Sequence, residues 1–466
     1  MLPHEIVGDI MSMIVHDQFS LHSKHRTDGK AYTWFPQALH VCRYLRSVAL
    51  ECSPIWSYID TSWPHLVGEL LRRSRSAPLT AVVQLNENGD PTTPDNQAIQ
   101  LVLEEMHRVK SLQFHENLVV TSLNLSYLPT GLFGNPASKI KDMNLKRLFV
   151  FNVRVPTELQ ILRGLQYLKI NRCSRPEHFV EPIPNVSSVS QIVGVLSQCP
   201  DLIEFEYNDY EDLDIPMAGS DTRLAPVALP HLRRIDLTLN ANSSVCILRH
   251  LVVPPEVLVY ISGQFTLNFD APIPPTYLLG FKTIKADMGQ SFFIEAETEM
   301  GYILLDLIPS TWSWEYMFRA VPQLFGVVLS QLESFELDEC HFLSSERGSF
   351  CEVWKSLLSS FTNLQYLRLS LSLSYVLVGL MDALGETNSG QCLICPILRE
   401  LVLEVDCPTI PPPPVWEKTI LCLRSRGEMH SRLAALDVSA CKRVQPDTEQ
   451  VRILASLVDS LLLPIL

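Results

Sequence analysis

The pattern that most constrains this chain is a short apolar spacing that recurs between residues 109 and 438. Apolar residues stand at positions i, i+3 and i+5 of each occurrence. The nine occurrences are Val109/Leu112/Phe114, Leu145/Leu148/Val150, Leu165/Leu168/Ile170, Leu202/Phe205/Tyr207, Leu232/Ile235/Leu237, Leu332/Phe335/Leu337, Leu364/Leu367/Leu369, Leu398/Leu401/Leu403 and Leu433/Leu436/Val438. In a strand, side chains alternate between two faces, so positions i+3 and i+5 point to the same side. Each occurrence therefore predicts a short strand with one buried side.

The last four occurrences begin at nearly constant intervals. They start at residues 332, 364, 398 and 433, which are 32, 34 and 35 residues apart. Helical apolar spacing fills the gaps, at residues 351–361, 374–385 and 415–426. Strands that alternate with amphipathic helices at a fixed period are typical of a solenoid. The L-x-x-L-x-L spacing is that of leucine-rich repeats, although those usually have about 20–29 residues.

The prediction is an α/β fold in which parallel strands alternate with helices in a curved, leucine-rich-repeat-like solenoid. A single doubly wound α/β domain alternates strands and helices similarly, but no glycine-rich phosphate loop supports it. The spacing fades between Leu237 and Leu332, where the sequence suggests one helix and then several strands. The region near residues 240–330 is therefore either a set of degenerate repeats or an insertion.

Length and charge exclude several classes of protein. A chain of 466 residues exceeds the roughly 250–300 residues at which a single core stops growing, so we expect two domains or a small domain with a repeat array. The net charge of -14 argues against nucleic acid as a partner. No run reaches the roughly 18 apolar residues of a membrane span, and we expect no membrane partner. The 12 scattered cysteines indicate reduced thiols in a cytoplasmic and/or nuclear protein.

Two apolar helices are predicted ahead of the repeats. The first follows Pro3 and aligns Ile6, Ile10, Met13 and Ile14. The second is closed by Pro54, and its apolar face comprises Ala38, Val41, Cys42, Leu45, Val48 and Ala49. Two helices are too few to fold alone, and an exposed apolar stripe usually meets a partner helix or a neighbouring domain.

The N-terminal residues resemble a known family. "LPHEI" followed by "VCRYLRSVALECSPIW" resembles the F-box motif, which usually reads Leu-Pro-x-Glu-Ile, a helix, Val-Cys-Arg-x-Trp-Arg and a closing Pro-x-Trp. Residues 57–85 and 423–444 are similar to F-box proteins with degenerate leucine-rich repeats, which are numerous in mushroom-forming fungi. The resemblance covers most of the chain and is strongest at both ends. Leu45 stands where the family normally has Trp, and the connection between the two helices is longer than usual.

The resemblance implies a division into three parts. Residues 1–60 would be an all-helical F-box, 61–108 a connecting segment with a first capping repeat, and 109–466 the repeat domain. It also implies a function without catalysis, as the substrate-recognition subunit of a Skp-cullin-F-box ubiquitin ligase. The F-box would bind a Skp-type adaptor and through it a cullin, while the repeats bind an unknown target protein.

The resemblance further implies which residues contact the adaptor. They are Leu2, Pro3, Ile6, Ile10, Val41, Cys42 and Leu45. Two alternatives stay open: these residues only hold the helices against the first repeat, or the protein is a leucine-rich-repeat interaction scaffold that does not engage the ligase.

The strand register predicts a target-binding surface. Residues at i+2, i+4 and i+6 point away from the buried side of each strand. The expected target-binding residues are Phe149, Tyr167, Glu204, Glu206, Glu336, Asp338, Tyr366 and Glu400. No two neighbouring strands both place Arg or Lys centrally, which disfavours a phosphorylated target. We expect an unmodified basic or mixed segment held by aromatic anchors, with ordinary solvated strand faces as the alternative.

No motif predicts catalysis, a metal or a cofactor. The sequence has no G-x-S-x-G, no H-E-x-x-H, no Walker loop and no dinucleotide fingerprint. Cys392 and Cys395 have C-x-x-C spacing without a second pair, and apolar Leu393 and Ile394 between them indicate buried thiols. An α/β enzyme would need polar residues clustered at strand ends. We therefore expect no catalytic residue, no metal ligand and no cofactor.

Overall fold

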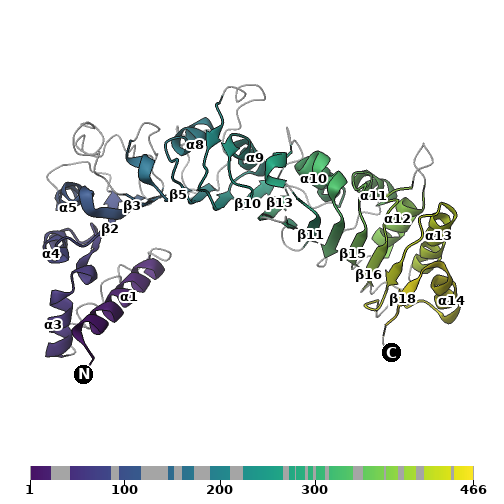
Figure 1. Ribbon diagram of the computed structural model, residues 1–466, viewed down its shortest axis with the longest axis horizontal. Helices are drawn as coiled ribbons and strands as arrows, with labels where there is room; N and C mark the ends of the chain where they lie inside the picture. Colours follow the sequence, from purple (N-terminus) through teal and green to yellow (C-terminus); the bar gives the residue numbers. More distant parts are fainter. Residues whose placement is uncertain are drawn as a thin grey trace, which may run out of the picture. The chain divides into compact units, whose positions relative to one another are not determined.

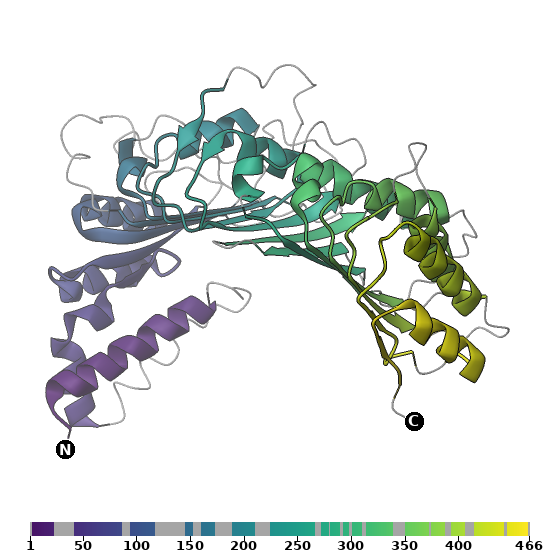
Figure 2. The same cartoon turned by 45° about the vertical axis from the view of Figure 1, so that its right-hand side comes forward.

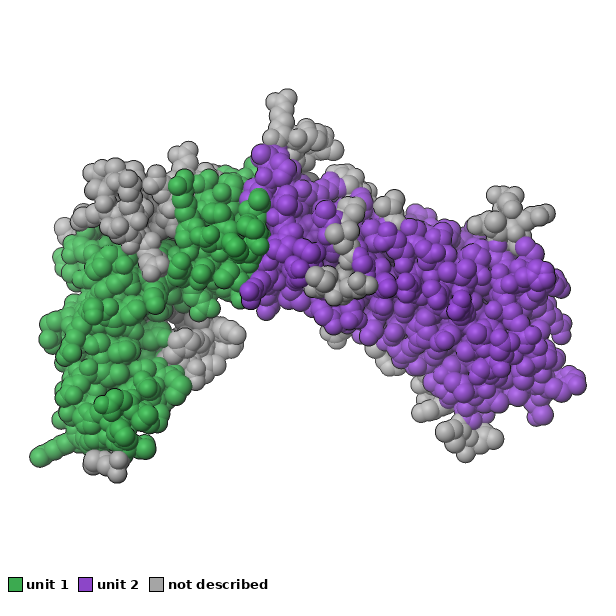
Figure 3. All heavy atoms as spheres, viewed as in Figure 1, with its two compact units in different colours: residues 1–211, 228–231 green, residues 212–227, 232–466 purple. Residues whose placement is uncertain are grey.

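The computed structural model describes most of the chain in 17 segments. They are residues 2–22, 42–85, 94–116, 145–151, 160–172, 189–209, 224–265, 272–278, 280–288, 292–297, 301–309, 314–338, 350–371, 374–386, 393–405, 414–441 and 445–464. The chain divides into two compact units (Figure 3): unit 1 has residues 1–211 and 228–231, and unit 2 has residues 212–227 and 232–466. The described residues form a mixed α/β structure with 11 α-helices and mostly parallel strands.

Unit 1 begins with helices and continues as a parallel sheet (Figure 1). Its α-helices are α1 (His4–His22), α3 (Arg43–Glu51), α4 (Pro64–Ser74), α5 (Pro94–Glu104) and α8 (Val189–Leu196), with 3-10 turns η1 (Ser53–Trp56), η2 (Met106–Arg108) and η5 (Gln160–Gly164). Its strands are β1 (Tyr58–Asp60), β2 (Leu79–Leu85), β3 (Val109–Glu116), β4 (Arg147–Phe151), β5 (Tyr167–Arg172) and β6 (Glu204–Asp209). Each of these strands is parallel to the next, so the order in the sheet follows the order in the chain.

Unit 2 places its helices on one side of its strands (Figure 2). The α-helices are α9 (Ala241–Arg249), α10 (Trp314–Phe325), α11 (Phe350–Leu358), α12 (Ser374–Gly385), α13 (Val415–Glu428) and α14 (Thr448–Leu457), with η7 (Pro275–Leu278) and η8 (Gly326–Gln331). The strands are β8 (Arg234–Thr238), β10 (Leu258–Phe265), β11 (Thr283–Met288), β12 (Phe292–Glu297), β13 (Tyr302–Pro309), β14 (Ser334–Asp338), β15 (Tyr366–Leu371), β16 (Glu400–Val405), β17 (Ala435–Asp437) and β18 (Ser460–Leu462). Two further strands have two residues each, β7 (Val227–Ala228) and β9 (Leu251–Val252).

The apolar spacing read from the sequence coincides with the strands. Each of the nine occurrences lies in or directly beside a strand, and every residue of the nine is buried. In β15, buried Leu367 and Leu369 alternate with partly exposed Tyr366 and Arg368. The predicted helices at 351–361, 374–385 and 415–426 are α11, α12 and α13. The α/β class is therefore confirmed, with strands that are mostly parallel.

The first backbone hydrogen bond between successive strands is made by the residue that follows the first apolar residue of the spacing, position i. The Gln365 amide donates to the Glu333 carbonyl at 2.8 Å, and the Arg399 amide donates to the Gln365 carbonyl at 2.8 Å. The preceding residue Leu364 is fully buried. A buried leucine thus holds the chain where the next amide reaches the preceding strand.

The centre of unit 2 departs from the repeat order. β8, α9 and β10 keep the sequence strand, helix, parallel strand. Strands β11, β12 and β13 instead form an antiparallel meander, in which β13 pairs with β10 and β11 pairs with β14, both in parallel. The expected helix and strands are present, and β11, which is parallel to β14, still follows a buried apolar residue, Phe281.

Two strands lie ahead of the first predicted one. Tyr58–Asp60 forms β1, which pairs with β2, and Ile59 is fully buried. The prediction that residues 1–60 are all helical is therefore wrong for the last three residues, because the parallel ladder extends into them. The boundaries expected at 60 and 108 stay predictions.

Gly379 in α12 tests the packing of the helix layer. An added Cβ at Gly379 would lie 2.5 Å from Phe350 Cβ in α11. We expect Gly379→Ala to lower the free energy of unfolding by about 1–3 kcal/mol, because the two helices must separate. Gly427 in α13 is the matched control, since an added Cβ there meets nothing within 4 Å. Gly427→Ala should keep or raise stability, by up to about 1 kcal/mol, in denaturant unfolding. Equal stability of the two variants would contradict the close packing.

Candidate functional site

Helix α1 carries two apolar stripes. Val7, Met11 and Val15 recur every four residues and are at most 8% exposed. The second stripe is exposed by 40–60% and comprises Leu2, Ile6, Ile10, Met13 and Ile14. The expected stripe is therefore the exposed one. The buried stripe was missed, although its spacing of four was the available signal.

Helix α3 lies against the first half of α1. Gly8 allows this approach, because an added Cβ would lie 3.2 Å from Cys52 Sγ. Ser12 Oγ donates to the Gly8 carbonyl at 2.9 Å and lies 3.6 Å from Cys52 Sγ. The Tyr44 hydroxyl donates to the Leu2 carbonyl. These contacts place the start of the exposed stripe beside the start of α3.

A buried tryptophan anchors the helix pair to the rest of unit 1. Trp56 is 4% exposed, and its Nε1 donates to the Ala49 carbonyl at 2.7 Å. The guanidinium of Arg73 in α4 lies 4.3 Å from the centre of the Trp56 ring, a cation–π contact. The buried side of α3 therefore packs against other residues of unit 1. The exposed stripe of α1 has no such cover among the described residues.

The predicted adaptor-binding residues fall into two groups. Leu2 and Pro3 precede α1, and Ile6 and Ile10 lie on its exposed stripe. At the start of α3, Cys42 is the N-cap, and its Sγ accepts from the Leu45 amide at 3.4 Å. Leu45 is partly exposed in the first turn. Val41 lies outside the described residues.

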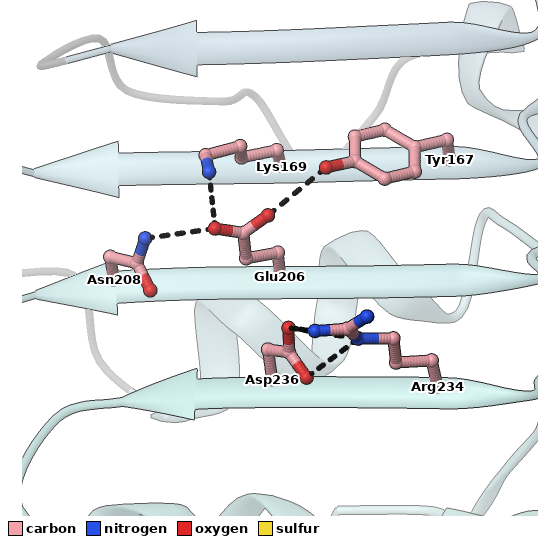
Figure 4. A network of polar contacts seen from close by, with 6 residues as sticks. All are labelled: Tyr167, Lys169, Glu206, Asn208, Arg234 and Asp236. Carbon is pink, nitrogen blue, oxygen red and sulfur yellow. Dashed lines mark hydrogen bonds and ion pairs between the residues drawn. The ribbon is translucent and has the colours of Figure 1, made fainter. Parts of the chain in front are cut away.

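A second candidate surface is the strand face of unit 1 (Figure 4). The predicted Phe149, Tyr167, Glu204 and Glu206 all lie on this face, in β4, β5 and β6. The ring centres of Phe149 and Tyr167 are 4.9 Å apart. Tyr167 lies opposite Glu204 in the register, and its hydroxyl reaches Glu206. The structure therefore brings these four predicted residues together.

One carboxylate on this face, Glu206, is bonded to three neighbouring side chains. Glu206 accepts from Tyr167 Oη at 3.0 Å, from Asn208 Nδ2 at 3.1 Å and from Lys169 Nζ (Figure 4). Burial acts to raise the pKa of Glu206, but the hydrogen bonds from Lys169 and Tyr167 outweigh it, and the pKa lies below its ordinary value. Burial, followed by the negative charge of Glu206, raises the pKa of Tyr167. The Glu206 carboxylate therefore already accepts hydrogen bonds from three side chains of the protein itself.

The strand face of unit 2 carries the other predicted residues. Glu336 and Asp338 lie in β14, Tyr366 in β15 and Glu400 in β16. Tyr366 lies directly opposite Glu400 in the register. In β8 of the same unit, Arg234 and Asp236 pair with each other at 2.7 Å (Figure 4).

Arg368 is the centre of an acidic group on this face. Its Nε donates to Glu404 Oε1 at 3.1 Å, and its Nη1 lies 3.3 Å from Glu336 Oε2 and 3.6 Å from Asp338 Oδ2. Asp338 also lies directly opposite Asp287 in the register. Burial and the neighbouring carboxylates raise the pKa of Asp338 despite Arg368. One guanidinium therefore does not neutralise its surroundings. The role of Arg368 was missed as a binding feature, because its three carboxylate partners lie 30 or more positions from it in the sequence.

Cys395, one of the two thiols predicted to be buried, is buried in the structure. Cys395 is 2% exposed, its Sγ lies 3.6 Å from the Leu358 carbonyl, and burial raises the pKa of this thiol to about 12. Cys392 lies outside the described residues. Arg426 is also buried, and it donates to the carbonyls of Ile394 and Cys395 at 3.0 and 2.8 Å. The Arg426 side chain therefore holds this loop through backbone carbonyls.

Comparison with known proteins adds no relative. No family model matches the chain, and no curated protein matches it. Within the described segments, no group of three or more His, Cys, Asp or Glu residues could hold a metal ion. None of the described helices is long and apolar enough to cross a membrane. The two kinds of surface, the stripe on α1 and the strand faces, are therefore interpreted from their own geometry.

Asp338 should lower stability at neutral pH. Its raised folded-state pKa means that ionisation disfavours the folded state, and this penalty disappears as the pH falls toward the ordinary value of 3.8. We expect Asp338→Asn to stabilise the protein at pH 7.5 by at most about 0.5 kcal/mol, because the side chain is partly exposed and water screens it. Urea unfolding at pH 7.5 and 4.0 should show a difference that closes in acid. Glu404→Gln is the control and should not stabilise, because it weakens the bond to Arg368. A destabilised Asp338→Asn at pH 7.5 would contradict the electrostatic account.

Proposed function

We propose that this chain is the substrate-recognition subunit of a Skp-cullin-F-box ubiquitin ligase. In this proposal the α1 and α3 helices bind a Skp-type adaptor and, through it, a cullin. The strand faces bind the protein to be ubiquitinated. The chain performs no chemical step and acts by holding two proteins together.

The exposed stripe of α1 is the observation that carries the proposal. Leu2, Ile6, Ile10, Met13 and Ile14 are 40–60% exposed, while the opposite stripe is packed inside unit 1. Covering a half-exposed isoleucine or leucine gains on the order of 1 kcal/mol. An apolar stripe of this extent is typical of a helix that meets another protein. The stripe contains Leu2, Ile6 and Ile10, three of the seven residues that the resemblance to the F-box motif assigns to the adaptor.

The arrangement around α3 supports the same interpretation. Tyr44 bonds to the Leu2 carbonyl and contacts the His4 ring, with ring centres 5.0 Å apart. The first residues of the motif are thereby held beside Cys42 and Leu45. Residues that are far apart in the sequence can thus act as one docking surface. The strand faces in turn offer partly exposed aromatic side chains, a residue type that is enriched at protein interfaces.

Charges placed in the exposed stripe should abolish adaptor binding. We expect Ile6→Glu combined with Ile10→Glu to weaken binding of a purified Skp-type adaptor on the order of 100-fold, because two carboxylates would be buried against an apolar partner. The buried stripe is untouched, so circular dichroism should not change. Leu421→Glu on α13 is the control, since Leu421 is 56% exposed and lies in unit 2. Calorimetry with full-length protein gives the affinity. Unchanged binding by the double variant contradicts the proposal, and a folded wild type that binds no adaptor favours the interaction scaffold.

Restoring the family residue should strengthen the complex. Leu45→Trp adds apolar area in the first turn of α3, and we expect adaptor affinity to rise about three- to tenfold. Leu421→Trp, measured in the same calorimetric titration, should leave affinity unchanged. If Leu45→Trp binds no better than wild type, Leu45 does not occupy the place of the motif's tryptophan.

A further inference from the structure

The strand face of unit 2 is acidic over β12, β11, β14, β15, β16 and β17, which are neighbours in that order in the sheet. Its carboxylates, here called the acidic face, are Asp287, Glu295, Glu297, Glu336, Asp338, Glu400, Glu404 and Asp437. Within strands β11, β12 and β14–β17, the cations are Lys285 and Arg368. Eight carboxylates against two cations leave an excess of six negative charges.

This acidity is local to unit 2. On the face of β4, β5 and β6 in unit 1, Arg147 and Lys169 balance Glu204 and Glu206. Lys169 is bonded to Glu206, and the Arg147 guanidinium lies 5.3 Å from the centre of the Tyr167 ring. The two faces have the same strand construction but different charge. The excess on unit 2 therefore does not follow from the repeat fold.

The carboxylates of the acidic face are placed against one another. The ladder pairs Asp287 directly with Asp338, and like charges in opposed positions of a sheet are destabilising. Arg368 is in contact with Glu336, Asp338 and Glu404 at once. A guanidinium is thus already held at this face, by three carboxylates from two neighbouring strands. The same geometry fits the side chain of a bound arginine or lysine.

An aromatic ring lies within the acidic face. Tyr366 in β15 is partly exposed and lies between Ser334 and Glu400 in the register. A tyrosine ring can cover the aliphatic stem of lysine or arginine and attract its cationic end. Aromatic and acidic groups are therefore adjacent, which is the combination that a basic peptide needs.

We propose that the acidic face binds a lysine- and arginine-rich extended segment of the target protein. This inference rests on the proposed function in one respect, because it takes the strand face as the surface that captures the target. Arg368 and Lys285 act as competitors built into the face, since they occupy carboxylates that the target's basic side chains would otherwise contact. Unit 1 contributes no comparable charge.

Neutralising the acidic face should weaken binding of a basic probe. The probe is a fluorescent peptide of alternating arginine and serine, titrated with full-length protein at low salt. We expect the triple variant Asp338→Asn, Glu400→Gln and Asp437→Asn to bind about tenfold more weakly, with a smaller dependence on salt. The control triple variant is Glu417→Gln, Glu428→Gln and Glu449→Gln on α13 and α14, which removes the same charge from the helix side. It should bind as wild type does.

Removing a built-in cation should have the opposite effect. We expect Lys285→Gln to raise affinity for the arginine–serine peptide about two- to threefold, since Glu295 and Glu336 flank Lys285 in the register. Lys285 is exposed, so this variant should fold as wild type does. Lower or unchanged affinity of Lys285→Gln contradicts the proposal.

Three further outcomes would overturn the inference. They are failure of the wild type to bind the basic peptide, equal binding of a glutamate–serine peptide, and equal weakening by the two triple variants. The last would show attraction by net charge alone. Adaptor binding by the wild-type protein, measured beside its peptide binding, separates this inference from the proposed function. Retained adaptor binding without peptide binding rejects only the basic target segment, and peptide binding without adaptor binding rejects only the ligase role.

Discussion

The structure depends on the backbone ladder between successive parallel strands and on the buried apolar residue, most often leucine, that precedes most of them. Without Leu364 in the core, the Gln365 amide would not be held at the Glu333 carbonyl. The same arrangement recurs at Leu398 and Leu433, where the next amides bond to the preceding strand. Each of these strands thus satisfies its backbone through the neighbouring strand, and its stability depends on that neighbour.

This construction separates the two sides of the strands. One side is filled by apolar residues under the helices, where Gly379 and Phe350 show how little space remains. The other side has no such constraint, so its side chains can vary without disturbing the core. In unit 1 they form the neutral network around Glu206, whereas in unit 2 they form the acidic face around Arg368. The parallel sheet therefore sets where strand-face residues can stand, and their side chains set the chemistry of each face.

Helix α1 has one buried and one exposed apolar stripe. Helix α1 packs on α3 and η1, and Gly8 lets α1 approach Cys52 at the end of α3. One stripe attaches α1 to unit 1, and the second is exposed to solvent. An apolar stripe kept exposed is costly in water, which is the physical reason to connect it with a partner.

The sequence by itself determined the nine strands, the three helices of the last repeats and the exposed stripe of α1. These follow from local periodicity, because alternation in a strand and the turn of a helix are set by neighbouring residues. It also placed Phe149, Tyr167, Glu204 and Glu206 on one face. Only the tertiary structure decided the meander of β11–β13, the strand β1, the second stripe of α1 as an internal contact, and the partners of Glu206 and Arg368. Those features depend on register and packing between segments that are distant in the chain, and no local spacing specifies them.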